Sequence, residues 1–173
     1  MNPNAYFTTL ARYNVWATGR LLEAVVVLPE SDYRRDVGLF FRSIHGTLAH
    51  LFVTEHALWF RRFAEGISPV VALDADLIPD RQELAAQLLA GARRWEALVA
   101  SVLPGRFDEH INYTTMRGEP ASLPFAATLG HVFNHGTHHR GQITAALTAL
   151  GQPCPMLDLV YFLQAQQLQE SPA

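Results

Sequence analysis

Four long stretches with helical spacing of apolar residues constrain the fold of this chain more than any other feature. They span residues 4–27, 43–66, 80–103 and 124–150. In the first stretch, Phe7, Leu21 and Val25 recur at the intervals of one helical face. Breakers stand at the ends, such as Pro29 after the first stretch and Gly66 at the end of the second. This pattern predicts four helices that pack on one another.

The segment between the third and fourth stretches has a different pattern. Residues 111–115 favour a strand and residues 117–120 favour a turn, so we expect a short two-stranded ribbon there. A last short helix is expected over 158–167. The sequence therefore predicts an all-α fold, an antiparallel four-helix bundle with a short hairpin-like connection between helices 3 and 4 and a short C-terminal helix. A single domain is expected over residues 1–173.

Composition and charge argue against several classes of protein. Hydrophobic residues make up 49% of the chain and charged residues 17%, which supplies a sizeable core and argues against intrinsic disorder. The formal net charge is −3 and no strongly basic stretch occurs, so no nucleic-acid partner is expected. No apolar run approaches the ~20 residues that cross a membrane. With one cysteine, Cys154, and no secretory signal, a cytoplasmic location is expected.

Histidine is concentrated in the fourth stretch, where four of the 8 histidines fall between residues 131 and 139. A helix turns about 100° per residue, so His131, His135 and His139 form a row on one face. Residues four apart can bring two imidazoles to one metal ion. Spacing alone leaves open whether His131 and His135 or His135 and His139 form the pair. His138 points about 100° away from His139 and cannot share its ion well.

A third ligand has to come from another helix, and His50 is the best candidate. One turn away on either side stand Thr47 and Thr54, whose small side chains leave room for an ion. His45 and His56 lie on a different side of that helix. Three imidazole nitrogens suit one divalent transition metal ion, with zinc or nickel favoured and iron, manganese or copper as alternatives. Three protein ligands also leave a coordination position open for water or substrate, as in catalytic sites.

The two histidine-bearing segments have recognisable sequences. Residues 43–51 read SIHGTLAHL and are followed by Trp59, and residues 134–143 read NHGTHHRGQI. These motifs resemble the second-helix and fourth-helix signatures of the DinB family, the damage-inducible (DinB/YfiT-like) four-helix-bundle proteins. Residues 13–17 and 157–159 match that family as well, so the resemblance extends over nearly the whole chain.

The resemblance implies a set of ligands and a range of functions. In the family, one histidine of the second helix and two of the fourth bind a divalent metal, and these correspond to His50, His135 and His139. Members of the wider superfamily are thiol-dependent S-transferases and isomerases. This implies that the metal activates a low-molecular-weight thiol, or water, against a small-molecule substrate in a stress or detoxification role. The alternatives are metal-dependent hydrolysis of a small substrate and a non-catalytic metal-binding stress protein. A homodimer is also implied.

Other polar and small residues of the fourth stretch are expected to support the site. His131, Asn134 and Gln142 could flank or orient the ligand imidazoles, with packing or solvation as the alternative for each. Gly136 and Gly141 are unfavourable inside a helix, by about 1 kcal/mol each relative to alanine. Their presence indicates the close approach of a neighbouring helix or of a ligand. The sequence identifies no catalytic residue beyond the metal-bound water or thiol.

Overall fold

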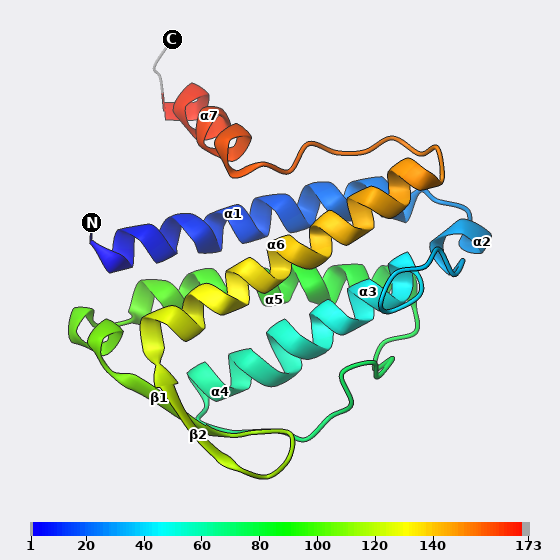
Figure 1. The fold of residues 1–173 in the computed structure, drawn as a ribbon. Coiled ribbons are helices and arrows are strands. Elements are labelled where there is room, and N and C mark those ends of the chain that lie inside the picture. Colours follow the sequence, from blue (N-terminus) through cyan, green and yellow to red (C-terminus); the bar gives the residue numbers. More distant parts are fainter. Residues whose placement is uncertain (1, 171–173) are drawn as a thin grey trace.

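The chain is mostly helical in the computed structural model, which describes residues 2–170 (Figure 1). The long segments are α1 (Pro3–Val26), a composite helix of α3 (Ile44–Leu51), the π-helix η1 (Phe52–Trp59) and α4 (Phe60–Ala64), then α5 (Arg81–Ser101) and α6 (Phe125–Ala149). The shorter helices are α2 (Glu30–Tyr33), the 3₁₀ helix η2 (Pro104–Asp108) and α7 (Leu159–Glu170). The four predicted long helices are confirmed, with ends shifted by one or two residues.

Side-chain caps fix where three of these helices begin. Ser43 accepts a hydrogen bond from the backbone N–H of Gly46 at the start of α3, and Asp80 caps α5 in the same way. The cap of α1 is Asn2, so this helix begins at Pro3 and not at residue 4, where the predicted stretch begins. The reason is Pro3, which lacks an N–H and has the backbone angle that suits the first helical position.

The predicted ribbon between α5 and α6 is present. Strands β1 (His110–Thr114) and β2 (Pro120–Pro124) pair antiparallel, and buried Ile111 anchors the ribbon to the core. A two-stranded ribbon is not stable by itself, so this packing against the helices holds it in place. The predicted all-α class is therefore corrected to a mostly helical fold with one small sheet.

Helix α1 contacts two neighbours that run in different directions. It runs antiparallel to α5. The hydrogen bond from Asn4, at the start of α1, to the carbonyl of Val102, just beyond the end of α5, shows this direction. It is parallel to α6, since Phe7 lies near Gly130 and Asn14 bonds to Arg140. The strictly antiparallel bundle predicted above is therefore wrong for the contact of α1 with α6.

The composite helix and α5 also run in the same direction, although they are consecutive in the chain. His56 lies against Gly91 and Phe60 packs on Trp95, so both helices advance together. The connection over residues 65–80 makes this possible, because it returns along the length of the bundle before α5 begins (Figure 1). The antiparallel prediction failed here because the sequence does not reveal that this connection returns along the bundle.

The two largest hydrophobic clusters of the core have polar residues between them. One cluster surrounds Tyr33 and Ile44, and the other surrounds Trp95 and Phe125. The polar side chains that α1, η1 and α6 bury at the level between them include Asn14, Glu55 and Arg140. This polar layer lies directly behind the part of α6 that carries the histidines.

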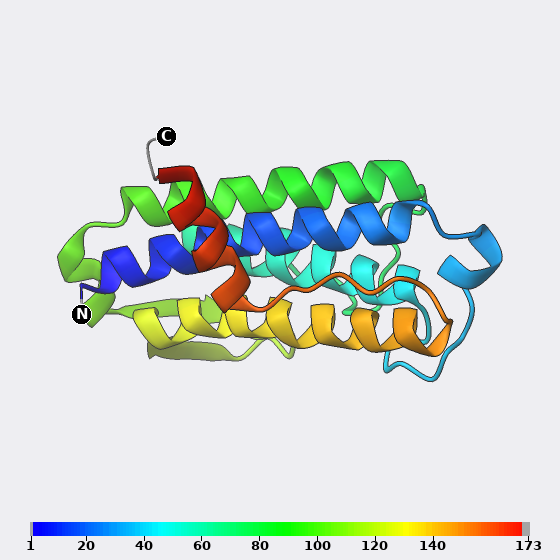
Figure 2. The same ribbon diagram turned by 90° about the horizontal axis from the view of Figure 1, so that it is seen from above.

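The C-terminal segment covers one side of the bundle. Figure 2 shows the chain after α6 running back along α6 and α1 before α7 crosses α1. The Tyr13 hydroxyl donates to the carbonyl of Leu157 at 2.7 Å, and Phe162 packs against Tyr13 and Trp16. These contacts attach α7 to α1.

Candidate metal centre

Three histidines converge where the composite helix meets α6. His50 lies in the last turn of α3, and His135 and His139 lie on successive turns of α6. The Nε2 atom of His135 is 3.3 Å from that of His50 and 3.1 Å from that of His139. One ring nitrogen of each residue lies within 4.8 Å of the others. The structure thus brings together the three predicted ligands, and His131 does not belong to this group.

Hydrogen bonds behind two of the rings determine which nitrogen faces the centre. His50 Nδ1 lies 2.7 Å from the carbonyl oxygen of Leu73, and His139 Nδ1 lies 2.7 Å from Oε1 of Gln142. Both oxygens are acceptors, so Nδ1 carries the proton of each neutral ring and Nε2 presents a lone pair. Metal-binding imidazoles are typically oriented by such a bond on the other nitrogen.

The third imidazole lies between these two lone pairs. His135 Nδ1 is buried and has no hydrogen-bond partner among residues 2–170. If the proton of His135 sat on Nε2, it could satisfy only one of the two facing nitrogens, and the other lone pair would remain opposed. A cation between the three nitrogens would satisfy all of them at once. The donor set therefore fits a divalent transition ion, for which neutral imidazoles are common ligands.

Burial keeps these imidazoles neutral. Desolvation lowers the pKa of His135 to about 3 and the pKa of His139 to about 4, and it also lowers the pKa of His50. The neighbouring histidines contribute to the low pKa of His135, because a proton on one ring opposes a proton on the next. At neutral pH the three side chains are thus in the unprotonated form that metal binding requires.

An aromatic side chain covers one side of the centre. The ring of Phe41 stacks on that of His50, with centroids 3.7 Å apart, and lies 5.7 Å from the ring of His139. Phe41 belongs to a tight turn in which Arg42 has a positive φ of 69°. A Cβ atom at Gly46 would lie 2.2 Å from the Phe41 carbonyl oxygen. The glycine of the SIHGTLAHL motif therefore lets this turn rest on α3.

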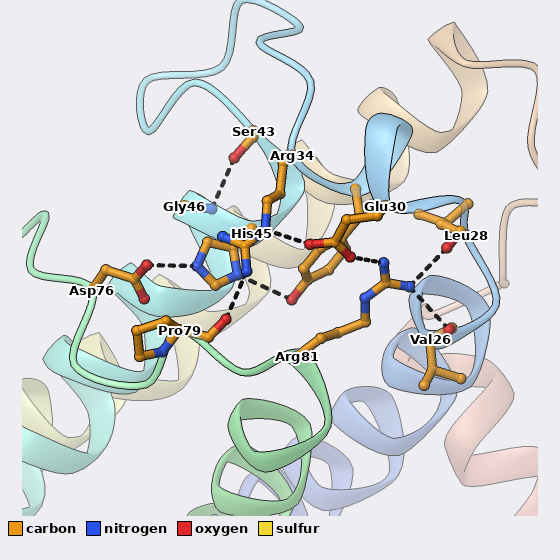
Figure 3. A network of polar contacts seen from close by, with 11 residues as sticks. Val26, Leu28, Glu30, Arg34, Ser43, His45, Gly46, Asp76, Pro79 and Arg81 are labelled. Atoms are coloured by element: carbon orange, nitrogen blue, oxygen red, sulfur yellow. Dashed lines mark hydrogen bonds and ion pairs between the residues drawn. The ribbon is translucent and has the colours of Figure 1, made fainter.

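A polar network holds the loop that supplies the Leu73 carbonyl (Figure 3). His45 Nε2 lies 2.9 Å from Asp76 Oδ2, and Arg34 donates to the carbonyl of Pro79 at 2.6 Å. These bonds tie the loop over residues 65–80 to α3 and to the end of α2. His45 thus orients a loop and lies away from the centre, as expected.

The three flanking residues predicted from the sequence have different surroundings. Gln142 bonds to His139, as described above. Asn134 lines a cavity on the other side of α6, because a residue beside His135 is turned by about 100° around the helix axis. The orienting role expected for Asn134 is therefore not supported. His131 is exposed, and its ring centroid lies 5.6 Å from those of His135 and Trp59.

A cavity of about 400 Å³ begins at His131, one helical turn from His135. Its lining is mainly apolar and includes Trp59, Tyr113 and Leu123. Arg62 lies behind this wall, with its guanidinium carbon 4.6 Å from the ring centroids of both Trp59 and Tyr113. The composite helix, the ribbon and α6 thus enclose a small space next to the histidines.

Two contacts of the centre were not predicted. The stacking of Phe41 depends on the turn before α3, and the Leu73 bond uses a backbone carbonyl in the long loop. Neither has a signal in the sequence, because any residue offers a carbonyl and neither residue lies in a histidine motif.

A buried polar network lies behind the centre, on another side of α6. Asn14 Nδ2 donates to Glu55 Oε2 at 3.3 Å, and Arg140 donates to Asn14 Oδ1 and to Thr137 Oγ1. Burial raises the pKa of the Glu55 carboxyl, whereas the charge of Arg140 opposes that shift. A Cβ atom at Gly136 would lie 2.5 Å from Glu55 Oε1. The close approach predicted for Gly136 is confirmed.

Comparison with known proteins identifies the family. The sequence profile described as "DinB family" matches residues 1–171. The chain belongs to the DinB family. It is also similar to Protein DinB of Bacillus subtilis (strain 168), with 28% identity over 164 residues, and the match covers 89% of this chain and 91% of that protein. No helix within residues 2–170 is long and apolar enough to cross a membrane.

A solved structure supports the fold. YfiT from Bacillus subtilis, described as a probable metal-dependent hydrolase with an unusual four-helix bundle topology, superposes with a TM-score of 0.64. The match has 19% sequence identity and covers 83% of this chain and 87% of that one. At this identity the likeness shows that the two chains share a four-helix-bundle fold.

Proposed function

We propose that the three-histidine centre of this DinB-family chain binds one divalent transition ion, zinc or nickel, and that the protein is a metal-dependent hydrolase of a small substrate. The observation that carries the proposal is the convergence of three Nε2 atoms, two of them held by bonds to Leu73 and Gln142. The description of YfiT as a probable metal-dependent hydrolase supports the reaction class.

The chemistry follows from an incompletely coordinated ion. A divalent ion held by three imidazoles would keep a position open and would lower the pKa of a water molecule bound there to near 7. The Leu73 carbonyl holds the imidazole of His50 in place, and Gln142 holds that of His139. The ring of Phe41 shields the His50 side of the centre from solvent. His131 stands between the centre and the neighbouring cavity, where it can contact a bound substrate.

The cavity beside His131 indicates the kind of substrate. Its volume of about 400 Å³ suits a small organic molecule, and its walls are built mainly from Trp59, Tyr113, Leu123 and Pro124. Among residues 2–170, no carboxylate, lysine or arginine belongs to this lining. We therefore expect an uncharged, largely apolar substrate with an ester or amide group directed toward the histidines.

Membership in the DinB family supports a second candidate, thiol transfer. The same ion would lower the pKa of a low-molecular-weight thiol in place of water. The thiolate sulfur would then form a bond to an electrophilic carbon, and the leaving group would depart with the electron pair of its bond to that carbon, as in an S-transferase reaction. Both candidates use the same three ligands and the same cavity, so only the identity of the nucleophile separates them. In either case we propose that the chain forms a single domain and assembles as a homodimer. We also propose that it acts in the cytoplasm, in a stress response or in detoxification.

Turnover of simple substrates distinguishes the candidates. The zinc-loaded or nickel-loaded chain is assayed for hydrolysis of p-nitrophenyl acetate, and in parallel for thiol-dependent turnover of 1-chloro-2,4-dinitrobenzene. We expect ester hydrolysis that is lost with a chelator and in His139→Ala, but kept in His138→Ala, which removes an exposed neighbour. Metal-dependent turnover of the thiol reaction alone would favour the S-transferase. Hydrolysis that survives chelation would contradict the proposal, and the absence of both activities would favour a non-catalytic metal-binding protein.

A further inference from the structure

A second cavity, of about 580 Å³, lies between α1, α6 and the segment that precedes α7. Figure 2 shows this segment running back along α1 and α6. The volume is within the range of sites for small organic ligands, about 300–1,000 Å³. His50, His135 and His139 are not among its lining residues.

Helix geometry separates this cavity from the metal centre. His135 and His139 face the composite helix. Thr137 and Gly141 each follow one of them by two residues, so they are turned by about 200° around the axis of α6. Both line the cavity. A ligand bound here would therefore occupy the opposite side of α6 from the ion.

The lining combines apolar walls with several polar groups, among them Asn134 and Thr144. Leu10, Phe133 and Leu157 contribute apolar surface from α1, α6 and the C-terminal segment. The hydroxyl of Tyr13, which also lines the cavity, is already bonded to the Leu157 carbonyl. Asp158 also belongs to the lining, and this residue is exposed to solvent. Such a surface suits an amphipathic molecule whose apolar part is longer than its polar part.

Arg140 supplies a buried positive charge to this lining. Its side chain is only 2% exposed. Its guanidinium donates to two neutral oxygens, Asn14 Oδ1 and Thr137 Oγ1, and its Nε atom has no partner among residues 2–170. It forms no ion pair with a carboxylate in that part of the chain. The Glu55 carboxyl acts on this charge only from beyond ion-pair distance. Buried charges are most stable when an opposite charge pairs with them directly, so an anionic group of a ligand is the complement of Arg140.

Gly141 is a second, independent indication that this space is used. Glycine is the least favourable residue after proline inside a helix. At Gly136 the nearby Glu55 carboxylate explains the absence of a side chain. At Gly141 a Cβ atom would meet nothing within 4 Å, and its φ is not positive. Packing and backbone conformation therefore do not require glycine there, whereas any larger side chain would enter the cavity.

We propose that this cavity is a ligand site separate from the metal centre, and that it takes a small amphipathic carboxylate. The apolar chain of the ligand lies between α1, α6 and the C-terminal segment, and its carboxylate pairs with Arg140. The proposal does not depend on the hydrolase or transferase activity, because no ligand of the metal lines the cavity.

Calorimetric titration of the full-length chain tests the proposal, with octanoate as the anionic probe and octan-1-ol as the uncharged probe of equal chain length. We expect octanoate to saturate a single site with a Kd on the order of 1 mM, at least about tenfold more tightly than octanol. Equal affinity for the two probes would overturn the pairing with Arg140. The absence of saturable octanoate binding would overturn the site itself.

A variant that fills the cavity locates the bound probe. Gly141→Leu is expected to fold, because space surrounds its Cβ, and to weaken octanoate binding at least about tenfold. The matched control is Ala145→Leu, which adds the same side chain one turn further along α6 at an exposed position outside the lining, and it should bind like the wild type. Thermal melting confirms that both variants are folded. Unchanged octanoate binding in Gly141→Leu would place the probe elsewhere and overturn the proposal.

Discussion

Two polar clusters lie within two turns of each other on α6, and they are built in opposite ways. In the buried network, groups of different kinds face one another, since Asn14 accepts from Arg140 and donates to Glu55. In the histidine cluster, three groups of the same kind face one another, with Nε2 atoms 3.1 Å and 3.3 Å apart. The groups of the first cluster are complementary to one another, whereas those of the second are complementary to a cation.

This difference indicates what each cluster contributes. A buried network of complementary groups holds α1, η1 and α6 in register, so changes to it should act on stability. The histidine cluster faces a side of the bundle where His135 is still partly exposed, so changes to it should act on ligand binding. The predictions below test this division, from the largest expected effect to the smallest.

Gly136→Ala should cause the largest loss of stability. The new Cβ would lie 2.5 Å from Glu55 Oε1 and 3.0 Å from Arg140 Nη1, so a buried charged network would have to shift. We expect the free energy of unfolding to fall by about 3 kcal/mol. Gly141→Ala is the matched control, because its Cβ meets nothing and alanine is the better helix former. It should raise stability by about 1 kcal/mol. Chemical denaturation of the metal-free proteins measures both, and equal effects would contradict the account.

His56 is a buried histidine outside the metal centre, and its effect on stability can be compared with the effects of the three ligand histidines on metal binding. It packs against Gly91, and burial, aided by the charge of Arg94, lowers its pKa to about 3. Because the folded pKa lies below the unfolded value near 6.5, the unfolded state binds more protons as the pH falls. Stability is therefore complete above pH 6.5 and is lost toward pH 3, by up to about 1.4 kcal/mol per pH unit.

Replacing His56 should remove this contribution. Between pH 7 and pH 5, metal-free His56→Gln is expected to lose about 2 kcal/mol less stability than the wild type. His138→Gln, at an exposed position of α6, should keep the wild-type profile. Denaturation midpoints across this pH range provide the measurement. Parallel profiles for His56→Gln and the wild type would show that His56 is not buried as a neutral ring.

Gln142→Ala should have the smallest effect on the fold and a moderate effect on the metal. Losing the bond to His139 Nδ1 frees the imidazole to rotate, which should weaken metal binding by about tenfold with little change in unfolding of the metal-free chain. Asn134→Ala, on the other side of the helix, should leave metal affinity unchanged. Competition with a chromophoric chelator gives both affinities. If both variants bind the metal equally well, the Gln142 bond does not support the centre.

The parts of the fold that depend on local signals could be predicted from the sequence. The four long helices follow from apolar spacing and breakers. Asp80, which caps α5, stands three residues before Glu83 in the pattern of a capping box. The relative directions of the helices could not be predicted, because they depend on the path of residues 65–80 along the bundle. The local pattern of that loop does not reveal where it leads.

The candidate site shows the same limit. Helical spacing placed His131, His135 and His139 on one face, and small neighbours favoured His50 as the ligand from another helix. The family resemblance selected His50, His135 and His139, which the structure brings together. The sequence could not separate Gln142, which bonds to a ligand imidazole, from Asn134, which faces away. Both are amides near a histidine, and only the rotation of the helix relative to its neighbours decides between them.

The central claim is that the three imidazoles form one metal site, and metal stoichiometry tests it most directly. The chain is stripped with a chelator, reloaded with zinc or nickel, desalted and analysed by mass spectrometry of the elements. The account predicts one ion per chain in the wild type and in His138→Ala, and almost none in His50→Ala, His135→Ala or His139→Ala. Retention of a full ion by all three of these variants would contradict it.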